Sequence, residues 1–194
     1  MNVEVLLFDG FDELDAVGPY EVLANGGRMD ADISVSTVTL EPEEMIVAAH
    51  GLTVVPDGQL GRPDLLVVPG GGWTTDGGVS RVVEDGDLPR AVADRHADGT
   101  AVASVCTGAM ILAAAGLLDG RPATTHHVAH DDVAEVADRV DARVVDDGEV
   151  VTAAGVTSGI DMGLWLLERE FGADVASRVE REMEYERRGD VYRG

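Results

Sequence analysis

Ala101-Val102-Ala103-Ser104-Val105-Cys106-Thr107-Gly108 is a short apolar run that ends at a cysteine followed by two small residues. The run is typical of a buried strand, and the small apolar residues of 108–118 predict a helix that follows at once. A strand, a sharp turn and a helix in this order form a nucleophile elbow. We therefore expect Cys106 to stand at such an elbow in an α/β fold.

Strand and helix patterns alternate on both sides of this stretch. Apolar or alternating segments predict strands at 3–8, 33–40 and 65–68, two short strands in 45–55, and a hairpin pair in 143–151. Helical signals predict a helix from Gly18-Pro19 to 25–27, and others in the second half of 79–97 and at 128–140, 160–171 and 173–188. Alternation of this kind implies a mostly parallel sheet, with the working site at the carboxyl ends of its strands. The length of 194 residues predicts one domain over 1–194.

The composition is strongly acidic, with 37 Asp and Glu against 14 basic residues, all of them Arg, and a net charge of −23. Such a surface repels phosphate backbones, so we expect no nucleic-acid partner. It is typical of halophilic proteins, in which concentrated salt screens the self-repulsion. No segment approaches the roughly 18 apolar residues of a membrane span, and the N-terminus lacks the basic start of a signal peptide. We expect no membrane association and a cytoplasmic location.

Cys106 is the only cysteine, so it cannot form a disulfide within the chain. At the N-terminus of the predicted helix, free N–H groups and the helix dipole would favour a thiolate and lower the pKa of the thiol. The alternative is a small buried apolar residue, which is the usual fate of a lone cysteine. The elbow pattern favours a reactive thiol.

Asp15 follows the first predicted strand and would therefore lie at the same edge of the sheet as Cys106. A carboxyl group there could hold the thiol by a hydrogen bond and move protons, and its own pKa should rise beside a thiolate. A helix cap is the alternative role for Asp15. Glu21 is a rival acidic partner further along the predicted helix.

Gly70-Gly71-Gly72 follows the buried strand at 65–68. Backbone N–H groups of this loop, together with the N–H of Thr107, could form an oxyanion hole that faces the thiol. A flexible turn is the alternative, whereas a phosphate loop lacks its Lys and Ser/Thr. Thr107 could also offer its hydroxyl to a substrate.

His126, His127 and His130 form a cluster in which the first and last lie four residues apart. Metal ligands can share a helix face at this spacing, but no further ligand completes a metal signature. We expect no metal site, and a structural or supporting role for His126.

Three motifs resemble the DJ-1/PfpI superfamily, and most of all its isonitrile hydratase branch; they lie at 104–126, 14–22 and 155–164. The resemblance implies a flavodoxin-like three-layer sandwich, a homodimer, a small-molecule substrate and no cofactor. It also implies an oxyanion role for Gly71 and Gly72, and a role for Asp15 in place of the Glu of many relatives. His126 matches the motif, whereas His127 takes a place where relatives often carry Trp. Trp73, Thr74 and Thr75 also follow no recognisable pattern, so the substrate stays open.

The activity implied is that of a cysteine-dependent hydratase or lyase that acts on a small electrophilic carbon. In the isonitrile case, Cys106 would form a thioimidate that is hydrolysed to an N-substituted formamide. The alternatives are a glyoxalase- or deglycase-like reaction on 2-oxoaldehydes and a thiol redox sensor without catalysis. Peptidase and glutamine amidotransferase activities are disfavoured, because Thr107 replaces the His of protease-like members and no His follows Val151. The end of the chain at Gly194 leads us to expect no DNA-binding domain.

Overall fold

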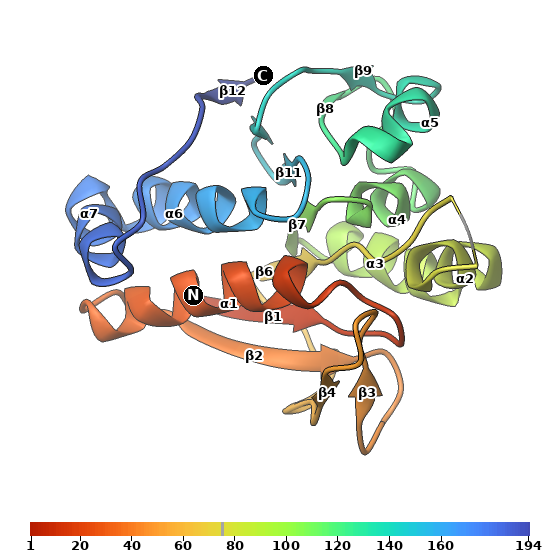
Figure 1. Cartoon of the computed structure of the whole chain (residues 1–194), viewed down its shortest axis with the longest axis horizontal. Helices are drawn as coiled ribbons and strands as arrows, with labels where there is room; N and C mark the ends of the chain where they lie inside the picture. The colour runs from red at the N-terminus through yellow and green to blue at the C-terminus, as the bar shows by residue number, and fades with distance from the viewer. Residues whose placement is uncertain (75) are drawn as a thin grey trace.

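The computed structural model describes residues 1–74 and 76–194, so the prediction for Thr75 lies outside the described residues. In this part of the chain, eight strands form one sheet in the order β12-β10-β11-β7-β6-β1-β2-β5 (Figure 1). Their bounds are β1 (Asn2–Leu6), β2 (Ser34–Thr39), β5 (Gly58–Gln59), β6 (Leu65–Val68), β7 (Ala101–Val105), β10 (Val144–Asp147), β11 (Val150–Ala153) and β12 (Val191–Arg193). Neighbouring strands are parallel except for the β10–β11 hairpin. The predicted mostly parallel sheet and the predicted hairpin are therefore confirmed.

Helices cover both faces of the sheet, which makes the fold a three-layer sandwich (Figure 1). One layer contains α1 (Glu13–Arg28), α6 (Ser158–Phe171) and α7 (Ala173–Glu182), which pack on one another. The other contains α2 (Gly78–Asp85), α3 (Asp87–Ala97) and α4 (Gly108–Ala114). None of the helices in the described ranges is long and apolar enough to cross a membrane.

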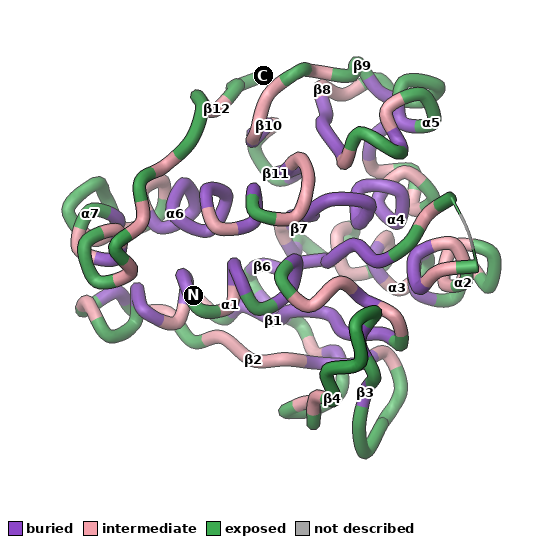
Figure 2. The backbone as a smooth tube through the Cα atoms, viewed as in Figure 1, coloured by how far each residue is buried: buried purple, intermediate pink, exposed green. Residues whose placement is uncertain are grey.

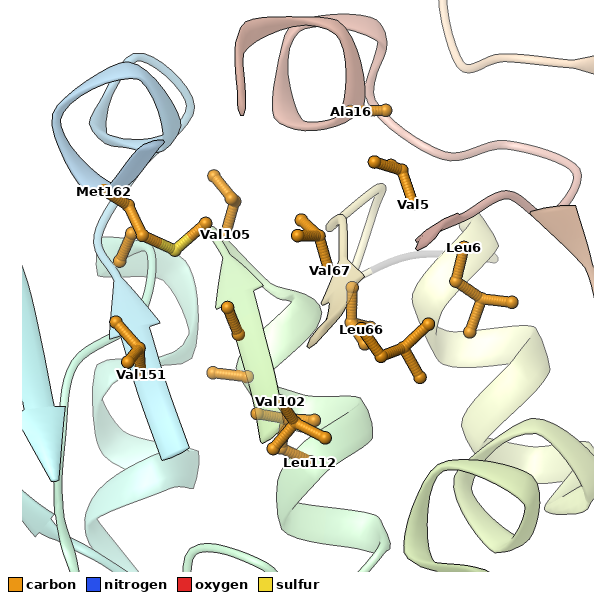
Figure 3. Packing of buried hydrophobic residues seen from close by; sticks show 14 of the residues in the cluster. Val5, Leu6, Ala16, Leu66, Val67, Val102, Val105, Leu112, Val151 and Met162 are labelled. Atoms are coloured by element: carbon orange, nitrogen blue, oxygen red, sulfur yellow. The ribbon is translucent and has the colours of Figure 1, made fainter. Parts of the chain in front are cut away.

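The core lies along the central strands β6, β7 and β1. Figure 2 shows these strands mostly buried, and every residue of β6 is buried. Figure 3 shows apolar side chains on both faces of β7, with Val105 toward α6 and Val102 toward α4. The central strands are buried on both faces because helices cover both, which explains their continuous apolar sequences.

Two smaller strand pairs lie outside the main sheet. The predicted short strands in 45–55 are β3 (Ile46–Val47) and β4 (Thr53–Val54), which form an antiparallel pair. The parallel pair β8 (Pro122–Ala123) and β9 (Asp138–Arg139) flanks a 3-10 turn at His127–Ala129 and α5 (His130–Ala134). The helix predicted at 128–140 is therefore confirmed only in its first half, because its second half turns back to pair with β8.

Helix α1 is longer at both ends than predicted. It begins at Glu13, where the Asp12 side chain accepts a hydrogen bond from the N–H of Leu14, so Gly18 and Pro19 lie inside the helix. It continues through 25–27 because Gly26 is buried against Leu167 of α6. Packing between α1 and α6 thus overrides the local signals for a start at Pro19 and a stop at the glycines.

The remaining helices agree with the predictions only in part. The helix predicted in the second half of 79–97 is present as α3, whereas α2, which precedes it and is separated from it by Gly86 with a positive φ of 82°, was not predicted. Helix α4 ends at Ala114 rather than at 118. Helix α7 ends at Glu182, and the chain then adds β12 to the edge of the sheet beside β10.

Candidate active site

Cys106 stands at the turn between β7 and α4, as the sequence predicts. Its φ of 57° lies in the left-handed region, which costs a residue with a side chain about 1–3 kcal/mol. Two contacts of the backbone hold this conformation. The N–H of Cys106 donates to the carbonyl oxygens of Ala153 and Ala154 at the end of β11, and the hydroxyl of Thr125 donates to the carbonyl of Cys106 at 2.8 Å.

The turn is closed on its far side by Gly108, the first residue of α4. A Cβ at this position would lie 2.8 Å from the carbonyl oxygen of Pro69 and would also collide with that of Val68. Only glycine allows the backbone of α4 to approach the end of β6 this closely. The small residue expected two positions after Cys106 therefore has a steric reason.

Asp15 lies on α1 and is fully buried. Its Oδ2 accepts a hydrogen bond from the N–H of Gly70 at 3.0 Å, and its carboxyl group interacts with the Cys106 side chain. Its other oxygen, Oδ1, has no hydrogen-bond partner among the described residues. Because Asp12 caps α1, the alternative role of Asp15 as a cap does not apply.

The environment of Asp15 favours its protonated form. Burial raises the pKa of Asp15 to about 7, and the negative charge of Asp12 acts in the same direction. The hydrogen bond from Gly70 and the interaction with Cys106 oppose this rise without cancelling it. A carboxyl group with such a pKa can both donate and accept a proton near neutrality.

The thiol of Cys106 is also harder to ionise than the sequence predicts. Only 6% of the residue is exposed, and burial, with the charge of Asp15, raises the pKa of the thiol to about 12. The expected fall of this pKa does not occur, because burial and the charge of Asp15 outweigh the hydrogen bonds that backbone N–H groups donate to the sulfur. When Asp15 is protonated its repulsion disappears, so the two groups titrate as one pair.

Two backbone N–H groups donate hydrogen bonds to the sulfur of Cys106 and thereby oppose the rise in the pKa of its thiol. One belongs to Thr107, whose N–H the sequence predicts as an oxyanion donor, and the other belongs to Val156. Val156 has a φ of 22°, which is rare for a β-branched residue. Val156 is not among the site residues predicted from the sequence, although it lies in the motif at 155–164.

The glycine loop lies against both Asp15 and Thr107. A Cβ at Gly70 would lie 2.7 Å from Oδ2 of Asp15 and 2.6 Å from Oγ1 of Thr107. The N–H of Gly71 donates to the Thr107 hydroxyl at 3.1 Å, so this predicted oxyanion donor is engaged by a side chain. Gly71 and Gly72 also line a cavity of about 460 Å³ that contains Arg81.

His126 and Glu21 lie differently from the buried pair. The ring of His126 packs against Gly155, where a Cβ would approach Cδ2 to 2.7 Å. Burial lowers the pKa of His126, and the neighbouring His127 and His130 add to this. Glu21 is exposed on α1, whereas Asp15 is buried, so the structure favours Asp15 over Glu21 as the partner of Cys106.

One group of side chains in the described residues has the spacing of metal ligands, and it is not the histidine cluster. It consists of Asp12, Glu13 and His50, whose ligand atoms lie within 4.8 Å of one another. A ring nitrogen of His50 lies 2.6 Å from Glu13, which also accepts hydrogen bonds from the N–H groups of His50 and Leu52. These contacts tie the β3–β4 hairpin to the start of α1.

Comparisons with known proteins identify the family of the chain. The DJ-1/PfpI family model matches residues 1–169. An isonitrile hydratase of Pseudomonas putida is 35% identical to this chain, over 95% of this chain and 78% of its own length. A deglycase of Thermococcus kodakarensis is 31% identical, over 79% of this chain and 89% of its own length. The crystal structure of a ThiJ/PfpI family protein from Pseudomonas syringae has a TM-score of 0.86 at 31% identity, over 96% of this chain and 76% of that one. The chain therefore belongs to the DJ-1/PfpI family.

Proposed function

We propose that this protein is a cysteine-dependent enzyme that hydrates a small electrophilic carbon, with an isonitrile as the leading substrate. The observation that carries the proposal is the buried pair of Cys106 and Asp15, in which burial raises the pKa of the carboxyl group to about 7. Similarity to the isonitrile hydratase of Pseudomonas putida supports the choice of substrate.

The proposed reaction begins with transfer of the thiol proton from Cys106 to the carboxylate of Asp15. The N–H groups of Thr107 and Val156 stabilise the sulfur anion during this step. The sulfur attacks the terminal carbon of the isonitrile, a C–S bond forms, and the carbon takes the proton from Asp15. The product is a thioimidate in which nitrogen is doubly bonded to the former isonitrile carbon.

Hydrolysis then uses the same carboxylate as a base. Asp15 takes a proton from water while the oxygen adds to the thioimidate carbon, and it passes this proton to the nitrogen. The hydroxyl group of the adduct then gives its proton to Asp15 as the carbonyl forms and the C–S bond breaks, and Asp15 returns that proton to the sulfur. The sum is one isonitrile and one water converted to one N-substituted formamide, with the enzyme regenerated.

The test is formamide production from an alkyl isonitrile by the wild type and by Cys106→Ala, Asp15→Asn and Glu21→Gln variants. We expect no turnover by Cys106→Ala, at least a hundredfold loss in Asp15→Asn, and near wild-type rates in Glu21→Gln. Undiminished hydration by Cys106→Ala would exclude the covalent mechanism.

A second candidate is a deglycase- or glyoxalase-like reaction on 2-oxoaldehydes, which the similarity to the Thermococcus kodakarensis deglycase favours. The same sulfur would attack a carbonyl carbon. Methylglyoxal assayed beside the isonitrile separates the two, because the better substrate should show the larger kcat/KM and depend on Cys106. If neither is consumed while peroxide oxidises Cys106, the non-catalytic thiol sensor is favoured.

A further inference from the structure

The segment 154–157 connects β11 to α6 and carries one of the two N–H groups that donate to the sulfur, that of Val156. Figure 1 shows this connection beside the end of β7, where the elbow begins. Val156 has the unfavourable φ of 22°. A residue keeps such a conformation only where its surroundings fix it, so contacts of the neighbouring residues must hold this N–H in place.

Arg143, the residue before β10, contacts this segment on both sides of Val156. Its carbonyl oxygen accepts a hydrogen bond from the N–H of Ala154 at 3.0 Å, and its Nη2 donates to the hydroxyl of Thr157 at 2.9 Å. The carbonyl oxygen of Ala154 in turn accepts a hydrogen bond from the N–H of Cys106 at 2.9 Å. The backbone and the side chain of one residue therefore fix the two ends of the segment beside the elbow.

The guanidinium group of Arg143 is itself fixed by Asp161, which is buried in α6. Nε of Arg143 donates to Oδ2 of Asp161 at 2.5 Å, and the hydroxyl of Tyr185 donates to the same oxygen at 3.0 Å. The other oxygen of Asp161, Oδ1, accepts a hydrogen bond from the N–H of Arg188 at 2.9 Å. Because a guanidinium group is planar, fixing Nε also sets the direction in which Nη2 points toward Thr157.

We propose that Arg143 is a positioning residue of the active site, which holds the N–H of Val156 on the sulfur of Cys106 by its contacts on both sides of Val156. An ion pair with Asp161 alone would only join the start of β10 to α6. The two further contacts, placed around a residue of unfavourable φ, give Arg143 this second role. The role rests on the proposed function, in which this N–H stabilises the sulfur anion.

The test is alkylation of Cys106 by iodoacetamide at pH 8, without a substrate. Thr157→Val removes the hydroxyl that Arg143 contacts, whereas Thr157→Ser keeps it, and both change an exposed residue. We expect the rate constant to fall about three- to tenfold in Thr157→Val and to stay near that of the wild type in Thr157→Ser. A hydrogen bond to a charged group changes the thiolate fraction by about tenfold, and the higher nucleophilicity of a less stabilised thiolate offsets part of this.

The direction of the change separates positioning from a merely structural role. A substitution that only loosened the site would expose the thiol to water, lower its pKa and speed alkylation. Amide hydrogen exchange gives a second measure. In Thr157→Val the amide of Val156 should exchange roughly tenfold faster, whereas that of Thr107, the other donor to the sulfur, should not change. Thr53→Val makes the same replacement at an exposed residue of β4 and should change neither measure.

Arg143→Lys keeps the positive charge beside Asp161 but lacks the second arm of the guanidinium group. It should slow alkylation as much as Thr157→Val does, and the double variant should be no slower, because all three break the same contact. If Arg143→Lys does not fold, the two Thr157 variants decide the question. Unchanged or faster alkylation in Thr157→Val would overturn the role of Arg143.

The same measurements distinguish this role from the proposed function. If the wild type hydrates no isonitrile while Thr157→Val is alkylated more slowly, the choice of substrate fails and the positioning role of Arg143 stands. If the wild type hydrates the isonitrile while alkylation and the exchange of the Val156 amide are unchanged in Thr157→Val, only the positioning role fails.

Discussion

Replacement of Asp15 by Asn should stabilise the protein at neutral and alkaline pH. Below pH 3.8, the carboxyl group is protonated in both the folded and the unfolded chain. Between 3.8 and about 7 the unfolded chain loses this proton while the folded protein keeps it, so stability falls as pH rises. Above about 7 the full penalty remains, and it amounts to about 4 kcal/mol for a rise of the pKa from 3.8 to about 7. Asn is neutral at every pH, and its side-chain oxygen can still accept the hydrogen bond from Gly70.

The assay is urea unfolding of the wild type and Asp15→Asn at pH 4, 6 and 8, in a fixed molar concentration of KCl. The gain in the free energy of unfolding should be near zero at pH 4 and approach roughly 4 kcal/mol at pH 8. Glu21→Gln is the matched control, because it removes an exposed carboxylate from the same helix and should show no such trend. A gain that does not depend on pH would refute the inference that Asp15 is protonated by burial.

Three further predictions concern the thiol, the glycine loop and the acidic surface. In Asp15→Asn the pKa of the Cys106 thiol should fall by about 1–3 pH units, because the repelling charge of Asp15 is gone. The pH dependence of alkylation by iodoacetamide measures this pKa, and an unchanged profile would contradict the electrostatic coupling of Asp15 to Cys106. Gly70→Ala should destabilise the fold by about 1–3 kcal/mol, because the added Cβ collides with Asp15 and Thr107. Thermal unfolding measures this loss, and Gly58→Ala is the control, because a Cβ there has no atom within 4 Å. The melting temperature should rise between 0.1 and 2 M KCl because salt screens the net charge of −23, and a constant value would argue against a halophilic surface.

Local sequence patterns predicted the elbow, the mostly parallel sheet and the β10–β11 hairpin. These features depend on apolar spacing and on turn residues within a few positions of one another, so a single stretch carries enough information. The same reasoning placed Asp15 and Cys106 at one edge of the sheet, where the structure brings them together. The single domain over 1–194 and the catalytic roles of these residues stay predictions.

Contacts between distant segments decided the rest. Packing of α6 against Gly26 extends α1, and the pairing of 138–139 with β8 ends the helix predicted there. The N–H of Val156 reaches the sulfur of Cys106 from fifty positions further along the chain. Most of all, the sequence by itself predicted a thiol of lowered pKa, whereas the structure raises it. The start of a helix at the cysteine can be predicted from neighbouring residues. Burial of the thiol and the nearness of a buried carboxylate exist only once the chain has folded, and here they outweigh the hydrogen bonds from the N–H groups of Thr107 and Val156.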